Sequence, residues 1–189
     1  LVDNSASAID WLDSMGITLS NLTTTGGMSE KRTHRPADGS AVGEYLVAGL
    51  LRNASEREIP VFVNAVVNKV NEKDGKVTGV NVSIDGQEKT IASNAVVLTT
   101  GGFGANMEMV TEYKPELNGF VTTNQKGSTG DGVVLAKEIG AATVDMGEIQ
   151  IHPTVEQSTS TLISESVRGE GAISSNYWIT RKICILNFR

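Results

Sequence analysis

The most constraining feature of the sequence is an uninterrupted apolar run that ends in glycines. Residues 95–100 read AVVLTT, and Gly101-Gly102-Phe103-Gly104 follows at once. Such a run predicts a strand buried on both faces of a mostly parallel sheet. Glycines at the carboxyl end of that strand let backbone approach a ligand in the crevice where open α/β sheets bind cofactors, although a tight turn produces the same pair. The run therefore favours an α/β fold with a candidate ligand site at its end.

Helices are expected before this run. Residues 5–15 carry apolar side chains at helical spacing, and Gly16 follows as a stop. A second helix is expected near 41–55. The segment 22–43 between them is rich in glycine, threonine and charge, and is expected to be a long loop. The loop carries three basic residues, Lys31, Arg32 and Arg35. Two interpretations stay open for them: contact with a phosphate-bearing cofactor, or exposure to solvent without a ligand.

A hairpin region is expected between the second helix and the apolar run. The segments 60–70, 76–84 and 87–93 have a strand-like alternation. They are separated by Lys73-Asp74-Gly75 and by Asp85-Gly86. Asp-Gly supports the positive φ angles of tight hairpin turns, so three antiparallel strands are predicted.

A second glycine motif, Gly130-Asp131-Gly132, lies just before a helix expected at 133–139. Backbone N–H groups at the start of a helix favour an anionic or hydroxyl-bearing ligand group. The alternative is a capped helix with Asp131 near its first turn.

The richest polar stretch is 150–171. Pro153 favours an extended backbone at His152, which keeps this histidine out of a helix interior. Glu165 and Arg168 are three residues apart, so they share a face if the segment is helical, with Ser164 beside them. On the residues alone, an active site competes with a capping histidine and a surface ion pair.

Composition narrows the function classes. The chain has 189 residues and a formal net charge of -6, which argues against a sequence-independent grip on nucleic acid or an anionic membrane. A single cysteine, Cys184, excludes an internal disulfide framework and a cysteine-cluster metal site, and two histidines argue against zinc. No apolar run approaches the roughly 20 residues of a membrane span. The absence of a G-x-S-x-G elbow disfavours a hydrolase, and the compartment stays open.

Taken in order, these pieces resemble the flavoprotein fumarate reductases of the soluble flavocytochrome c type, within the fumarate reductase and succinate dehydrogenase family of FAD proteins. The resemblance covers about residues 1–173. It is carried by GGMSEKRTHRPADGSAVG (26–43), the hairpin region with Asn64 to Val67, VVLTTGGFGAN (96–106), FVTTNQKGSTGDG (120–132), QIHPT (150–154) and SESVRGEGAI (164–173).

The resemblance implies an α/β fold and a set of FAD contacts. Residues 1–148 would form part of a Rossmann-like FAD-binding domain with a β-hairpin insertion, and 149–189 the start of a clamp domain over the flavin. The family's TTGGF motif closes a strand against the cofactor. The cofactor-binding residues implied are Val67, Thr100, Gly101, Gly102, Gly130, Asp131 and Gly132.

The resemblance also implies a dicarboxylate site and a proton relay. His152 matches the histidine that holds a substrate carboxylate, and Ser164 stands where the family often has threonine as a substrate contact. Glu165 and Arg168 match members of the relay that recharges a proton-donating arginine. In that family, reduced FAD gives hydride to one alkene carbon of fumarate and the relay protonates the other. An electron-donor protein or domain is implied, and haem or covalent FMN domains can accompany the fold.

Three features of that family are not found in the chain. The dinucleotide fingerprint is expected upstream of Leu1, and the proton-donating arginine and the later substrate histidine and arginine are expected downstream. The tail 174–189 departs from the family pattern. The sequence therefore predicts that the parent protein is a fumarate reductase and that the isolated chain is inactive. Two alternatives stay open, a related flavin-dependent reductase of another unsaturated acid such as urocanate and a non-catalytic α/β interaction module.

Overall fold

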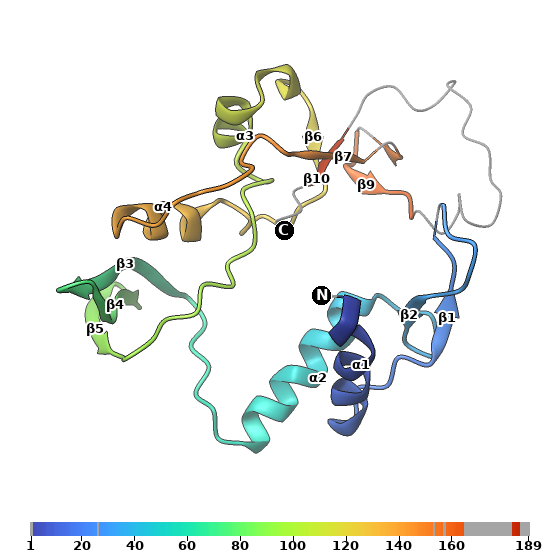
Figure 1. Ribbon diagram of the computed structural model, residues 1–189, viewed down its shortest axis with the longest axis horizontal. Coiled ribbons are helices and arrows are strands. Elements are labelled where there is room, and N and C mark those ends of the chain that lie inside the picture. The colour runs from blue at the N-terminus through green and yellow to red at the C-terminus, as the bar shows by residue number, and fades with distance from the viewer. Residues whose placement is uncertain (1, 26, 153, 157, 165–182, 186–189) are drawn as a thin grey trace. The chain divides into compact units, whose positions relative to one another are not determined.

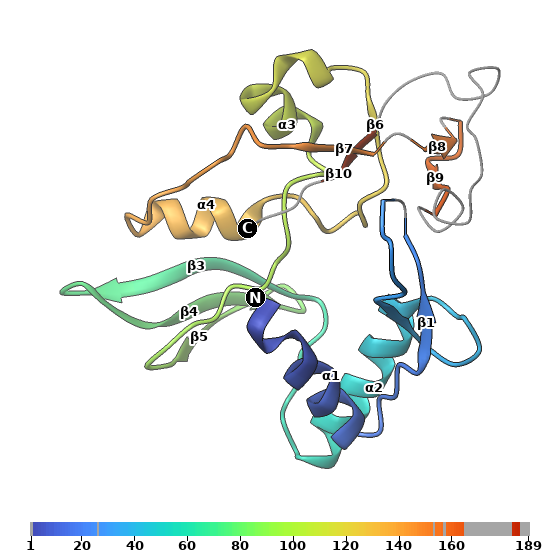
Figure 2. The same cartoon turned by 45° about the vertical axis from the view of Figure 1, so that its right-hand side comes forward.

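The computed structural model describes residues 2–25, 27–152, 154–156, 158–164 and 183–185. Helices and small sheets alternate along the chain, which confirms the predicted α/β class (Figure 1; turned by 45° in Figure 2). The chain divides into two compact units, whose main parts are Leu1–Phe62 and Val63–Ile163. The expected boundary near residue 148 between an FAD-binding domain and a clamp domain is not the same division, and it stays a prediction. No helix in the described ranges has the length and apolar content to cross a membrane.

The described residues of the first unit form two α-helices, a short 3-10 helix and one pair of short strands. A short 3-10 helix, η1 (Val2–Asn4), leads into α1 (Ser5–Ser14), and α2 spans Val42–Glu56, so both helical predictions are confirmed. The expected long loop contains regular structure: β1 (Asn21–Thr23) pairs antiparallel with β2 (Thr33–Arg35). The prediction of a long loop missed these strands, because the pairing joins residues as distant in sequence as Asn21 and Arg35, which no local pattern encodes.

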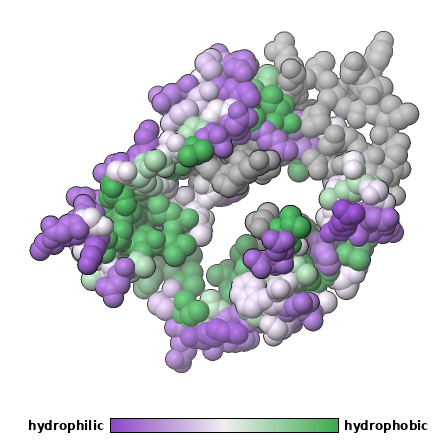
Figure 3. Space-filling view, viewed as in Figure 1, coloured by the Kyte–Doolittle hydropathy of each residue, from purple (hydrophilic) through white to green (hydrophobic). Residues whose placement is uncertain are grey.

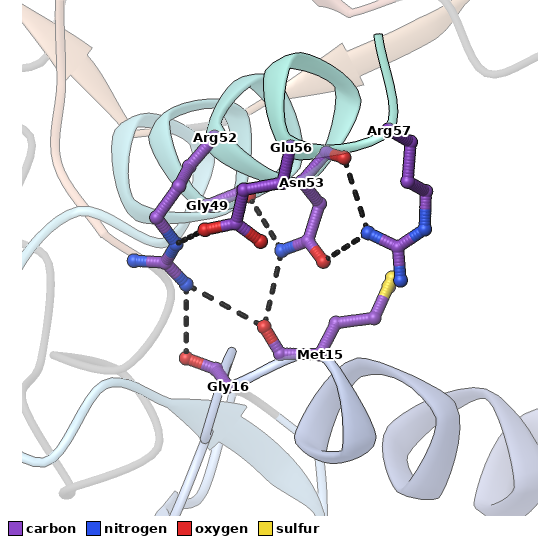
Figure 4. Close-up of polar contacts among 7 residues, drawn as sticks. All are labelled: Met15, Gly16, Gly49, Arg52, Asn53, Glu56 and Arg57. Carbon is purple, nitrogen blue, oxygen red and sulfur yellow. Dashed lines mark hydrogen bonds and ion pairs between the residues drawn. The ribbon is translucent and has the colours of Figure 1, made fainter. Parts of the chain in front are cut away.

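Asn53 of α2 ties the end of α1 to α2, as Figure 4 shows. Its amide donates to Met15 O at 3.0 Å and to Gly49 O at 2.9 Å, and its Oδ1 accepts from Arg57 at 2.7 Å. The side chain is only 6% exposed, so these three bonds satisfy a buried amide. Arg52 makes longer contacts with the same turn, at 3.4 Å to Met15 O and 3.5 Å to Gly16 O.

Replacing Asn53 with alanine is expected to destabilise the first unit by about 2 kcal/mol, because it removes the hydrogen bonds that the buried amide makes to Met15 O, Gly49 O and Arg57. Urea denaturation followed by tryptophan fluorescence measures this, since Trp11 lines the groove between the helices beside Asn53. The matched control is Arg52→Ala, which removes long contacts of an exposed side chain and is expected to cost less than about 0.5 kcal/mol. Equal losses of unfolding free energy in the two variants would contradict the role of Asn53 as the main polar link between α1 and α2.

The second unit begins with the predicted hairpin sheet. Its strands are β3 (Ala65–Lys73), β4 (Lys76–Ile84) and β5 (Gln87–Ala92), in the order β3-β4-β5 and antiparallel throughout. Both turns have positive φ at two successive residues, with 54° and 75° at Asp74-Gly75 and 51° and 74° at Asp85-Gly86. The Asp-Gly prediction is therefore confirmed. The strand β3 begins at Ala65 rather than at residue 60.

The two faces of this sheet differ in polarity. One face carries a polar cluster across all three strands: the Oδ1 of Asn81 accepts from Asn71 at 2.8 Å and from Thr90 at 3.0 Å. Valine pairs lie in register on the strands, Val67 with Val82 and Val70 with Val80. Apolar side chains gather over the sheet and the neighbouring helix α4 (Asp131–Glu138) in Figure 3. Among the exposed ones are Val66, Val67, Ile91 and Val134.

The apolar run 95–100 does not form the predicted buried strand. These residues lie outside any helix or strand, and Val97 is 83% exposed. A strand buried on both faces needs strands beside it and layers above and below, and the described residues supply neither. The prediction of a buried strand from the apolar run 95–100 was therefore wrong for this chain.

The rest of the second unit packs on a small core. Phe103, Val110, Leu117 and Ile149 are buried together, and the Phe103 and Tyr113 rings lie 5.6 Å apart. The remaining elements of this unit are short: α3 (Met107–Tyr113), the 3-10 helix η2 (Pro115–Leu117), β6 (Val121–Thr122), α4, β7 (Gln150–His152), β8 (Val155–Glu156), β9 (Thr161–Leu162) and β10 (Ile183–Ile185).

The strand β10 lies between β6, to which it runs parallel, and β7, to which it runs antiparallel. It belongs to the tail 174–189 that the sequence sets apart. The strands β8 and β9 form a separate antiparallel pair directly after His152.

Candidate cofactor and substrate site

The two glycine motifs singled out in the sequence meet in the structure. Gly130 N–H donates to Gly102 O at 3.1 Å, and a Cβ built on Gly132 would collide with the Thr100 hydroxyl. The contact joins backbone to backbone because neither side carries a side chain at the point of approach. We call the six residues 100–102 and 130–132 the glycine junction.

Within the glycine junction, Gly130 is the residue with the strongest requirement for glycine. It caps the N-terminus of α4 with φ at +87°. A Cβ there would lie 2.6 Å from Met109 Sδ and 2.9 Å from Phe103 Cβ. Asp131 lies in the first turn of α4, as the capped-helix interpretation expected, but α4 has no side-chain cap; the Asp131 carboxylate accepts from Thr129 Oγ1 at 2.9 Å. The helix begins two residues earlier than the predicted Val133.

Asparagine side chains that the sequence analysis did not single out support the junction. Asn106 caps α3 by accepting from Met109 N–H at 3.0 Å, and its amide donates to Thr129 O at 3.0 Å. Asn124 packs directly against Gly104. The signal for Asn106 was present as an N-cap residue before a helical segment, but α3 itself was not predicted.

His152 is the last residue of β7 and is 3% exposed. Its placement at the end of a strand agrees with the effect expected from Pro153. The ring Nδ1 lies 3.3 Å from Thr154 N and 3.4 Å from Thr154 Oγ1. The side chain is therefore held by the segment that follows it.

The other predicted site residues have separate outcomes. Val67 lies in β3 beside a register shift and is partly exposed. Ser164 is half-buried and has a polar or electrostatic contact. Glu165 and Arg168 lie outside the described residues. The other histidine of the chain, His34, was not a predicted site residue; its Nδ1 lies 3.0 Å from Leu19 O.

Glu156, the last residue of β8, has a lowered pKa. The Thr159 and Ser158 hydroxyls and the backbone N–H groups of the same two residues donate to its carboxylate, and they lower its pKa from 4.5 to about 2. These bonds favour the ionised form of the Glu156 carboxyl. They also link Glu156 to Ser158 and Thr159, shortly after the candidate substrate histidine in the chain.

The model of the family described as the FAD binding domain matches residues 1–178. The chain belongs to the FAD-binding domain family. Its match ends within the segment 174–189 that departs from the expected pattern. FAD is the cofactor of this family, which confirms the cofactor prediction at the level of the parent family.

Relatives and solved structures agree on the family. The chain is 55% identical over 176 residues to the NADH:fumarate oxidoreductase of Klebsiella pneumoniae, across 93% of this chain and 19% of that protein. It is 39% identical over 179 residues to a fumarate reductase (cytochrome) of Shewanella frigidimarina, across 93% of this chain and 31% of that protein. The open conformation of a flavocytochrome c3 fumarate reductase superposes with a TM-score of 0.82 at 39% identity, covering 90% of this chain and 31% of that one. The chain thus spans less than a third of these relatives.

The glycine junction fits an edge of a flavin cofactor. Gly101 is exposed with φ at +74°, and a Cβ there would meet only Ser128 Oγ, at 3.8 Å, so its backbone is open to a large ligand. The start of α4 lies at the same junction, and helix N-termini favour the phosphate groups that FAD carries.

Gly130→Ala is expected to destabilise the second unit by about 1–3 kcal/mol more than Gly140→Ala, because only the first change forces a methyl group into packed atoms. The pair is matched, since Gly140 has φ at +86° and its Cβ would meet nothing within 4 Å. Denaturation midpoints of the two variants measure the difference. Equal midpoints would show that left-handed strain alone accounts for the cost of Gly130→Ala.

The Glu156 carboxyl is expected to titrate near pH 2 rather than near 4.5. Because its folded pKa is lowered, the turn gains stability that is present above pH 4.5 and lost as the pH falls through about 2. Carbon-detected NMR of the side-chain carboxyl measures the midpoint. Thr159→Ala should raise it, since that hydroxyl lowers the pKa most, and a midpoint of 4.5 in the unchanged chain would refute the assignment.

Proposed function

We propose that the chain is part of an FAD-dependent oxidoreductase that reduces fumarate to succinate. The observation that carries the proposal is the 55% identity, over 93% of the chain, to a protein named NADH:fumarate oxidoreductase. The glycine junction and His152 support it, because the exposed backbone at Gly101 is accessible to a cofactor and the buried imidazole is held in position for an anion.

The glycine junction is proposed to hold one edge of FAD, which supplies hydride when it is bound and reduced. Thr100, Gly101 and Gly102 would lie against the cofactor along their backbone. Gly130, Asp131 and Gly132 would meet it at the start of α4, and the backbone of Val67 would contact its adenine end. The absence of side chains at residues 101 and 102 allows this approach without displacing packed atoms.

His152 is proposed to hold one carboxylate of the substrate. A buried hydrogen bond to an ionised group is stronger than a neutral one, and water exclusion around the ring increases that strength. The Ser164 hydroxyl would add a second hydrogen bond. Fixing the carboxylates orients the alkene carbons and polarises the double bond, which lowers the barrier to hydride addition.

Glu165 and Arg168 are proposed as the outer part of the proton path. A guanidinium normally keeps its proton. Arg168 would therefore release a proton to the next group only transiently and would regain one from solvent through the same relay. A carboxylate three residues away can accept and return a proton within that chain. The electron donor is proposed to be a separate protein or domain.

The test uses the full-length protein encoded by the gene. It should purify with a yellow flavin spectrum and oxidise a reduced viologen in the presence of fumarate, while the 189-residue chain should bind flavin weakly and lack this activity. His152→Ala should lower kcat/KM for fumarate by about 10- to 100-fold, the value of one hydrogen bond to a charged group.

The matched control is His34→Gln, which keeps a donor for Leu19 O and is expected to leave kcat/KM within about twofold. A full-length protein without flavin would contradict the proposal. Faster turnover of urocanate than of fumarate would reassign the substrate and keep the flavin chemistry.

A further inference from the structure

The backbone N–H of Thr154, a group that can only donate a hydrogen bond, lies beside the His152 ring. This N–H points at Nδ1 over 3.3 Å, and the Thr154 hydroxyl lies 3.4 Å from the same nitrogen. The hydroxyl donates its only hydrogen to Ile163 O at 3.1 Å, and Ile163 N–H donates to Thr154 O at 3.0 Å. Two bonds to Ile163 therefore hold Thr154 in place beside the ring.

This contact decides which ring nitrogen carries the proton. A backbone N–H can only donate, so Nδ1 must accept from it. A neutral imidazole has one donor and one acceptor nitrogen, so its hydrogen then resides on Nε2. The opposite tautomer would place an Nδ1 hydrogen against the Thr154 N–H. Donation from Nδ1 to the hydroxyl, at the longer distance of 3.4 Å, would have to overcome that repulsion.

We propose that Thr154 is a positioning residue that holds neutral His152 in the Nε2–H tautomer. The tautomer is inferred from the two contacts that Thr154 makes with Nδ1, without reference to flavin or substrate. Its use, a single N–H donor directed from Nε2 at a substrate carboxylate, rests on the proposed function.

The other histidine of the chain provides an internal control. His34 Nδ1 lies 3.0 Å from Leu19 O, and a carbonyl oxygen can only accept. His34 therefore carries its hydrogen on Nδ1. The two histidines are expected to adopt opposite tautomers, a pattern that an unfolded chain cannot give because both rings would then have the same environment.

The experiment labels the histidine rings of the full chain with ¹⁵N and reads the ring nitrogens by two-bond correlation NMR at about pH 8, above the ordinary range of histidine titration. His34→Gln assigns the signals. We expect one Nδ1–H ring, His34, and one Nε2–H ring, His152. An Nδ1–H signal from His152 while His34 keeps its own would overturn the proposal.

Substitutions at residue 154 separate the two groups of the threonine. Thr154→Pro removes the N–H, and is expected to reduce the preference of His152 for Nε2–H by on the order of tenfold, the value of about one hydrogen bond. Thr154→Val keeps the N–H and removes the hydroxyl, and Thr154→Ser keeps both, so both should retain the tautomer. A merely structural threonine would give the same tautomer in all three variants.

The His34 signals report whether each variant is folded. If Thr154→Pro disturbs them, the unchanged chain and Thr154→Val decide, and an Nδ1–H His152 in either one refutes the proposal. The NMR result is independent of flavin and substrate. A confirmed tautomer in a protein that does not reduce fumarate would therefore remove the proposed function and leave the positioning role of Thr154 intact.

Discussion

The backbone hydrogen bond from Gly130 to Gly102 is the contact on which the candidate cofactor site depends. It brings together two loops about thirty residues apart, and a Cβ on Gly130 would collide with Met109 and Phe103 beside the contact. Phe103, the next residue after Gly102, is buried in the core of the second unit. The core thus anchors one side of the junction, and the N-terminus of α4 provides the other. The shape of the site follows from packing at positions that touch no ligand.

The position of the candidate substrate histidine, His152, also depends on contacts with neighbouring residues. His152 ends a strand, and the residues that follow it fold back as the β8–β9 pair, so that Thr154 faces the ring. Glu156 stabilises the turn of that pair through bonds to its ionised form. A short local hairpin therefore orients the imidazole, whereas the proton relay proposed for Glu165 and Arg168 lies beyond the described residues.

Sequence reasoning succeeded where the determining interactions are local. The turns at Asp74-Gly75 and Asp85-Gly86 need positive φ, which their residue types supply, so the three-stranded sheet was predictable. The family and its cofactor were also predictable, because several modest motifs occur in one order. The run 95–100 failed because its burial depends on partner strands. The contact between Gly102 and Gly130 and the role of Thr154 depend on which loops meet, and no periodicity encodes that.

The central claim is that the glycine junction forms one edge of a flavin site. A structure of the full-length protein with FAD bound tests it most directly. We predict that backbone atoms of residues 100–102 and 130–132 lie in contact with the cofactor, with no side chain between them and the bound FAD. A cofactor bound away from both segments would contradict the account.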